Sequence, residues 1–193
     1  MSNYFTDDEY EDQDFSQIDF SDEAIRDISF YNCTFERCSF QYTDLSHSSF
    51  DNCEFKNCNM SLVKLEGTHI FDSKFSDCKL IGSNWGSLKG LFKAEFDECI
   101  LDNAVFPDMN LQLFSFAGCT FNSASFDNCN LSQATFDDCD LKNCLFTRSN
   151  LTRADFSTAY NYTINTAINT ITQAKFSLPE ATSLLQNFDI TLI

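Results

Sequence analysis

Apolar residues recur at every fifth position along most of this chain. One series runs from Phe15 to Trp85, and a second series, shifted by one inserted residue near 86–90, runs from Leu91 to Phe156. Neither the 3.6-residue period of an α-helix nor the 2-residue period of a β-strand produces this spacing. So short and regular a repeat predicts a solenoid that turns once per repeat, with a local bulge at the insertion.

A second inward position lies two residues before each apolar centre. All ten cysteines occupy it, namely Cys33, Cys38, Cys53, Cys58, Cys78, Cys99, Cys119, Cys129, Cys139 and Cys144. Elsewhere this slot holds mostly Ala and Ser, which indicates a limit on size. Zinc knuckles need closer cysteines, and parallel stacked thiols are poorly oriented for disulfides. We therefore expect buried, free cysteines that pack as small hydrophobic residues, with no metal and no cofactor.

Three consecutive units, Cys-Asn-Leu-Ser-Gln (129–133), Ala-Thr-Phe-Asp-Asp (134–138) and Cys-Asp-Leu-Lys-Asn (139–143), show the pattern most clearly. This pattern resembles the pentapeptide-repeat family over about residues 15–156. The resemblance implies an all-β fold, a right-handed quadrilateral β-helix with one pentapeptide per side and four per coil. Residues twenty apart should then stack on one side, and they match: Phe15, Phe35, Phe55, Phe75, Phe96, Phe116, Phe136 and Phe156 form one column.

The two ends of the chain depart from the repeat. We predict an acidic N-terminal tail over 1–14, the β-helix over 15–156 and a C-terminal cap over 157–193. Pro179 and Glu180 suit the first turn of a short α-helix over about 179–188, with Ser177 or Leu178 as its cap. An apolar stripe and a hydrophobic tail follow, and we predict that they form a dimer interface: Leu184, Leu185, Phe188, Ile190, Leu192 and Ile193.

The segment from Ala174 to Ala181, followed by Leu184 and Leu185, is similar to the tail of the topoisomerase-protecting members of the family. Those members are the Qnr proteins, MfpA and McbG. The resemblance implies that two rods pair through their C-termini and that the dimer acts on DNA gyrase or topoisomerase IV. The long projecting loops of the Qnr type are missing here, so MfpA or McbG is the nearer architectural match.

The net charge of −17 restricts the choice of partner. An acidic protein is repelled by nucleic acid and by anionic membranes, and its field directs it toward basic surfaces. The N-terminus is acidic where a signal peptide would be basic and then apolar, and no stretch approaches the ~20 apolar residues of a membrane span. We therefore expect a soluble, cytoplasmic protein with a protein partner.

The outward positions beside the phenylalanine column carry more acids than bases. We predict that this side of the rod mimics duplex DNA and occupies the basic DNA-binding saddle of a type II topoisomerase. The predicted contact residues are Glu36, Asp77, Glu95, Asp97, Glu98, Asp137, Asp138 and Asp155. Quinolone protection, toxin immunity and regulation stay open as outcomes. A scaffold protein with an unrelated partner is the alternative, because every soluble solenoid needs a polar surface.

The sequence argues against an enzyme. Its two histidines, His47 and His69, occupy outward or turn positions with no Ser or Cys nucleophile placed beside them. The carboxylates are spread along a convex rod, where no cleft would remove them from water. We therefore predict no catalytic residues.

Overall fold

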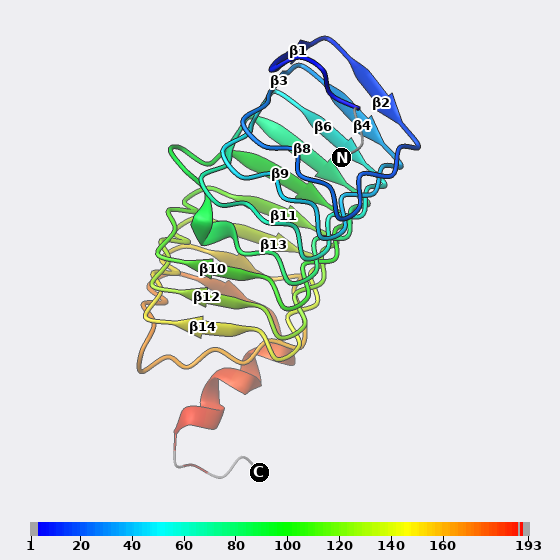
Figure 1. Ribbon diagram of the computed structural model, residues 1–193. Coiled ribbons are helices and arrows are strands. Elements are labelled where there is room, and N and C mark those ends of the chain that lie inside the picture. The colour runs from blue at the N-terminus through cyan, green and yellow to red at the C-terminus, as the bar shows by residue number, and fades with distance from the viewer. Residues whose placement is uncertain (1–3, 189, 191–193) are drawn as a thin grey trace.

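The computed structural model describes residues 4–188 and residue 190. The chain winds into a rod of stacked coils, with the N-terminal coil at one end and a short helix at the other (Figure 1). All strand pairs are parallel, and the pairing register is twenty residues, as in Phe15 opposite Phe35, except from β8 to β9, where it is twenty-one. The predicted all-β, quadrilateral β-helix is therefore confirmed.

Three parallel sheets form the sides of the rod. The long sheet runs the whole length and contains β2 (Asp14–Ser16), β4 (Thr34–Glu36), β6 (Glu54–Lys56), β8 (Ser73–Ser76), β9 (Ala94–Asp97), β11 (Ser115–Ala117), β13 (Thr135–Asp137), β15 (Asp155–Phe156) and β16 (Lys175–Phe176). A second sheet belongs to the N-terminal half: β1 (Glu9–Glu11), β3 (Ser29–Tyr31), β5 (Ser49–Asp51) and β7 (His69–Phe71). A third belongs to the C-terminal half: β10 (Val105–Pro107), β12 (Ser125–Asp127) and β14 (Leu145–Thr147).

The strands are centred almost entirely on aromatic residues, although three aromatic centres, Phe20, Phe40 and Phe121, lie on sides without strands. Every strand is centred on an aromatic residue except β7, whose centre is Ile70. The sides joined only by isolated bridges are mostly centred on aliphatic residues, such as Leu45, Leu101 and Leu131. Aromatic side chains favour extended backbone, and here each ring also stacks on the ring of the next coil.

The corners explain why cysteine occupies the small slot. At most corners that do not follow a strand, the chain closes with a backbone turn bond, as from Ala154 N to Leu151 O (3.0 Å). After a strand no such bond forms, and the slot side chain donates to the carbonyl of a centre in the previous coil. Nine of the ten cysteines do this, for example Cys78 Sγ to Phe55 O at 3.3 Å. The slot therefore selects a small side chain that can also donate a hydrogen bond.

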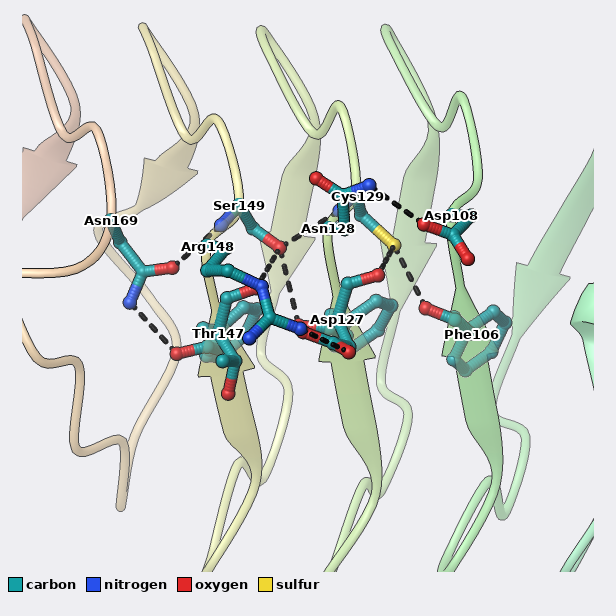
Figure 2. Close-up of polar contacts among 11 residues, drawn as sticks. Phe106, Asp108, Asp127, Asn128, Cys129, Thr147, Arg148, Ser149 and Asn169 are labelled. Atoms are coloured by element: carbon teal, nitrogen blue, oxygen red, sulfur yellow. Dashed lines mark hydrogen bonds and ion pairs between the residues drawn. The ribbon is translucent and has the colours of Figure 1, made fainter.

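Figure 2 shows one such column of slot residues beside the third sheet. Cys129 Sγ donates to Phe106 O (2.9 Å), Ser149 Oγ donates to Phe126 O (3.2 Å), and Asn169 Nδ2 donates to Phe146 O (2.7 Å). Neighbouring slots are also joined, because Cys129 N donates to Ser149 Oγ (3.0 Å) and Ser149 N donates to Asn169 Oδ1 (2.9 Å). A continuous polar chain therefore runs through the wall of an otherwise apolar core.

All ten cysteines are buried and free, as predicted. Burial raises the pKa of the Cys53 thiol to about 12 and that of Cys129 to about 11. At neutral pH these thiols keep the proton that makes the hydrogen bond, and they are poor nucleophiles.

The inserted residue lies where the coil changes pattern. Before it the strand register is twenty, and from β8 to β9 it is twenty-one, with Ser73 opposite Ala94. The one-turn helix η1 (Trp85–Ser87) occupies this position, visible midway along the rod in Figure 1. Trp85 is buried and contacts rings on both sides of the break, including Phe75 (5.8 Å) and Phe106 (6.0 Å). We refer to residues 85–93 as the coil break.

Three expectations need correction. Leu91 was predicted to open the second inward series, but it is 75% exposed, because the extra residue turns it outward and Phe92 packs on Trp85 instead (5.5 Å). The N-terminal segment is not simply a tail up to residue 14, because β1 pairs with β3. The repeat also continues past residue 156, because β16 pairs with β15.

The C-terminal helix is of the 3-10 type, η2 (Glu180–Asn187), where an α-helix capped by Ser177 or Leu178 was predicted. Pro179 is the N-cap residue, and no side chain caps the helix. The carboxylate of Glu180 instead accepts a hydrogen bond from Asn161 N (3.1 Å), which ties the helix to the last coils. Short helices at chain ends often adopt this tighter i to i+3 bonding.

Candidate functional site

The candidate site is the outer surface of the long sheet. Its core is a stack of nine phenylalanine rings, one more than predicted because Phe176 joins it, with centroid spacings between 4.8 and 5.5 Å. Each ring fixes the direction of the outward residues beside it, because successive side chains of a strand point to opposite faces. The outward groups therefore form straight rows along the rod.

The structure separates the predicted acidic residues into two groups. In the first group each carboxylate has a basic partner: Glu36 with Arg37 (3.4 Å), Glu95 with Lys74 (3.9 Å) and Asp155 with Lys175 (2.7 Å). Hydrogen bonds from Lys175 and Ser157 hold the pKa of Asp155 below its usual value. These pairs are exposed, so each contributes little stability, but each reduces the negative charge that a partner would meet.

The second group, which we call the acidic patch, consists of Asp77, Asp97, Glu98, Asp137 and Asp138. All of them are exposed, and none forms an ion pair within the described residues. They lie on the middle coils, since Asp97 and Asp137 are both in register with Ala117 between them. The patch extends over about 14 Å, three strand spacings, with roughly one negative charge per 3 Å.

Gly118 keeps the centre of the patch open. It has φ of +60°, a left-handed conformation that glycine adopts at no steric cost. A Cβ at this position would come within 2.4 Å of the Glu98 carboxylate. The glycine therefore leaves room for the Glu98 side chain to lie along the corner of the rod.

An adjacent side of the C-terminal half carries no carboxylate. Its outward residues lie within 110–113, 130–133, 150–153 and 170–173, which contain no Asp or Glu. Asparagines form a ladder there, with Asn130 Nδ2 donating to Asn110 Oδ1 (3.0 Å) and Asn150 Nδ2 to Asn130 Oδ1 (3.3 Å). The negative potential of this half is therefore concentrated on particular sides.

The predicted dimer residues are partly described. Leu184 packs against the core, whereas Leu185, Phe188 and Ile190 are exposed on and after η2, Phe188 by 53%. The remaining two, Leu192 and Ile193, lie outside the described residues. The exposed three are apolar groups at the C-terminal end of the rod, where a second copy could cover them.

Sequence reasoning did not identify the pairing of two lysines with the predicted acids. Lys175 lies twenty residues after Asp155, and Lys74 lies twenty-one residues before Glu95, across the inserted residue. Counting one coil forward and back from each acid would have found both partners. No Lys or Arg lies one coil before or after the five acids of the acidic patch, and this distinguishes them from Glu95 and Asp155.

The described residues contain no group of three or more His, Cys, Asp or Glu side chains that could hold a metal ion. The ring of His69 contacts Asp51 (3.2 Å) and Lys89 O (3.1 Å). No helix within residues 4–188 is long and apolar enough to cross a membrane. The outer surface thus offers charge and shape to a partner.

Comparison with known proteins agrees with this geometry. The family profile described as "Pentapeptide repeat region" matches residues 28–90 and 89–159. No curated protein sequence matches the chain. The chain is similar in structure to HetL from Nostoc sp. strain PCC 7120, a protein involved in the regulation of heterocyst differentiation, with a TM-score of 0.60, 13% identity, and coverage of 88% of this chain and 86% of HetL. For QnrB1, a plasmid-mediated fluoroquinolone resistance protein, the TM-score is 0.42 at 18% identity, covering 96% of this chain and 100% of QnrB1.

Proposed function

This chain belongs to the pentapeptide-repeat family, and from that premise we propose that it is a DNA-mimicking binding protein for a type II topoisomerase, DNA gyrase or topoisomerase IV. The observation that supports this most is the acidic patch on the long sheet. Its carboxylates are exposed, aligned in rows and without basic partners in the described chain. Binding would protect the enzyme from quinolones or a toxin, or would modulate it.

The spacing of the patch supports mimicry of a nucleic acid backbone. Phosphates along one DNA strand contribute one charge per 3.4 Å of axis, and the patch has one charge per about 3 Å. The long sheet, nine strands at about 4.8 Å spacing, gives a rod of about 38 Å. A basic saddle that holds duplex DNA would attract such a surface, and complementary charge would speed and orient the encounter.

A dimer would lengthen the mimic. The exposed residues Leu185, Phe188 and Ile190 provide an apolar contact at the C-terminal end of the rod. Two rods joined there would extend over about twice the length of one, on the order of 75 Å. We expect this dimer in the cytoplasm, where a topoisomerase is available.

The test is DNA supercoiling by purified gyrase, and decatenation by topoisomerase IV, with the protein titrated in with and without a fluoroquinolone. We expect inhibition or relief from the drug, and we expect the quadruple variant Asp97→Lys, Glu98→Lys, Asp137→Lys, Asp138→Lys to need at least about tenfold more protein for the same effect. The matched control reverses four exposed acids on other sides: Glu9→Lys, Asp22→Lys, Asp27→Lys and Glu66→Lys.

Equal loss in both variants would show that only net charge matters and would reject the patch as the contact. No effect of the wild-type protein on either enzyme would reject the proposal, and a scaffold with an unrelated partner would replace it. Sedimentation of Phe188→Asp beside the wild type tests the dimer separately.

A further inference from the structure

A groove runs along the corner of the rod between the second sheet and the long sheet and ends at the coil break. Its N-terminal part, a hollow of about 440 Å³, is lined mostly by polar groups from successive coils. Its second part, about 660 Å³, shares Asn52, Asp72 and Lys74 with the first, so the two are continuous. The groove crosses about five strand spacings, roughly 24 Å, which is the length of about seven residues of extended chain.

The two parts of the groove differ in chemistry. Four carboxylates line the N-terminal part, Asp12, Asp14, Glu54 and Asp72, with one cation, Lys74. Glu54 is paired with Lys56 and Asp72 with Lys93, so Asp12 and Asp14 are the two lining carboxylates without an ion partner among the described residues. The part at the coil break is richer in apolar side chains: Leu91, which the inserted residue turns outward and which is 75% exposed, and Leu113, 67% exposed at an outward position of the next coil, with Phe71, Phe92 and Phe114 beside them. Clusters of exposed apolar side chains on a soluble protein usually mark interaction sites.

A third hollow, about 310 Å³, adjoins the apolar part and shares Leu91, Phe92 and Asn110 with it. Trp85 lines this hollow and is 1% exposed, and its buried Nε1 has no acceptor among the described residues. A buried donor without an acceptor is costly, so an occupant that brings a carbonyl oxygen would remove that cost. Peptide backbone supplies one such oxygen per residue.

We infer that this groove is a docking site for an extended, cationic segment of a partner protein, with Lys or Arg side chains along the acidic part and one or two large apolar side chains seated at the coil break. The length, the carboxylate lining and the apolar end fit such a segment together. The inference goes beyond the proposed function and does not depend on it, because the groove lies at the corner of the rod and excludes the acidic patch.

The experiment presents random twelve-residue peptides, displayed on phage, to the full-length protein. Selection is repeated against the double variant Leu91→Asp, Leu113→Asp and against the control Leu145→Asp, which changes a leucine of similar exposure, 61%, on β14. Selected peptides are then synthesised without tryptophan, so that emission from Trp85, the one tryptophan of the chain, reports occupation of the coil break. Circular dichroism verifies that each variant is folded.

We expect the selected peptides to combine Lys or Arg with Leu, Phe or Tyr, and to bind the double variant at least about tenfold more weakly while binding Leu145→Asp as they bind the wild type. Glu54→Lys and Asp14→Lys should also weaken binding, as should added salt. Selection of no peptide, selection of peptides without cations, or equal binding to the double variant would overturn the inference. A wild-type oligomer lost only in the double variant would show that a second copy occupies the groove, and would overturn it too.

Discussion

The two halves of the rod use the same repeat differently. In the N-terminal half, strands occupy two adjacent sides, as β3 and β4 do, whereas in the C-terminal half they occupy alternate sides, as β9 and β10 do. The order of centres differs in the same way. Aromatic centres mostly come in runs of two or three neighbouring sides before the coil break, as in Phe50 and Phe55, and mostly alternate with leucine after it.

This difference teaches that the repeat determines the coil, while the distribution of aromatic centres favours particular sides for the sheets. The slot residues follow the same rule. After strands the slot is usually cysteine, which donates to a carbonyl, and after leucine-centred turns in the C-terminal half it is usually alanine, because the backbone closes the turn itself. In each repeat, the choice of the centre residue and the choice of the slot residue therefore specify how that side of the rod is built.

The largest expected effect comes from Trp85→Ala, which removes the side chain that contacts rings of both halves. Loss of a buried aromatic residue costs about 3–5 kcal/mol. We also expect it to separate the halves, so that urea unfolding followed by circular dichroism shows two transitions. Thiol labelling with mass mapping assigns them, because five cysteines lie on each side of the break.

Phe116→Ala is the control for this variant, since it lies in the ring stack of one half. It should lower stability by a similar amount and leave one transition. A single transition in Trp85→Ala, with all ten thiols labelled together, would show that the halves are coupled by the sheets rather than by this side chain.

A medium effect is expected at the cysteines. Cys78→Ala removes a donor to Phe55 O and Ser76 O at a corner without a turn bond, and should cost about 1–3 kcal/mol. Cys144→Ala should cost less, because the corner before it is closed by the bond from Cys144 N to Leu141 O (3.0 Å). Urea midpoints of both variants, with Cys78→Ser as the variant that keeps a donor, measure the difference; equal losses would mean that the slot is selected by size alone.

Gly118→Ala should cost about 1 kcal/mol, because alanine is strained at positive φ and its Cβ meets the Glu98 carboxylate. An equivalent corner of the N-terminal half is Asn57, with φ of 55°, where Asn57→Ala adds no such contact. The larger loss should therefore be at Gly118. Thermal unfolding compares the two, and equal losses would contradict a role for the glycine in accommodating Glu98.

The smallest effect concerns acid. The Arg26 guanidinium holds the pKa of Asp44 below its usual value, and Lys175 does the same for Asp155. Because both folded pKa values are depressed, these pairs stabilise the rod above about pH 4 and lose that contribution as the pH falls through the folded pKa. Asp44→Asn should reduce the pH dependence of the free energy of unfolding at low pH more than Asp155→Asn does, since the Asp44 side chain is less exposed.

Urea midpoints between pH 2 and 6 test this order, with Asp97→Asn as the control, because Asp97 has no ion partner among the described residues. If the urea midpoint of Asp44→Asn changes with pH as that of the wild type does, the pair of Arg26 and Asp44 contributes nothing to stability. The direction of the effect follows from the sign of the shift alone.

Much of the fold could be predicted from periodicity, because a residue such as Phe136 is placed by counting from its neighbours. The columns of phenylalanine and cysteine are confirmed. The exposure of Leu91 could not be predicted, because one inserted residue can be absorbed at several positions and packing of Phe92 on Trp85 decides among them. The acidic residues were located, but their neutralisation by Lys74 and Lys175 depends on contacts between coils.

The twenty-residue register limits how this protein can evolve. Loss or gain of one pentapeptide would rotate every later residue by one side, so that Asp137 and Asp138 would leave the row of Asp97 and Glu98. Only whole coils can be duplicated or deleted without scrambling the surface, each changing the length by about 4.8 Å. Insertions and deletions in the gene therefore preserve the surface pattern only when they add or remove whole coils of twenty residues. A single extra residue is tolerated only at a place like the coil break, where the five-residue phase of the apolar centres is restored before β9.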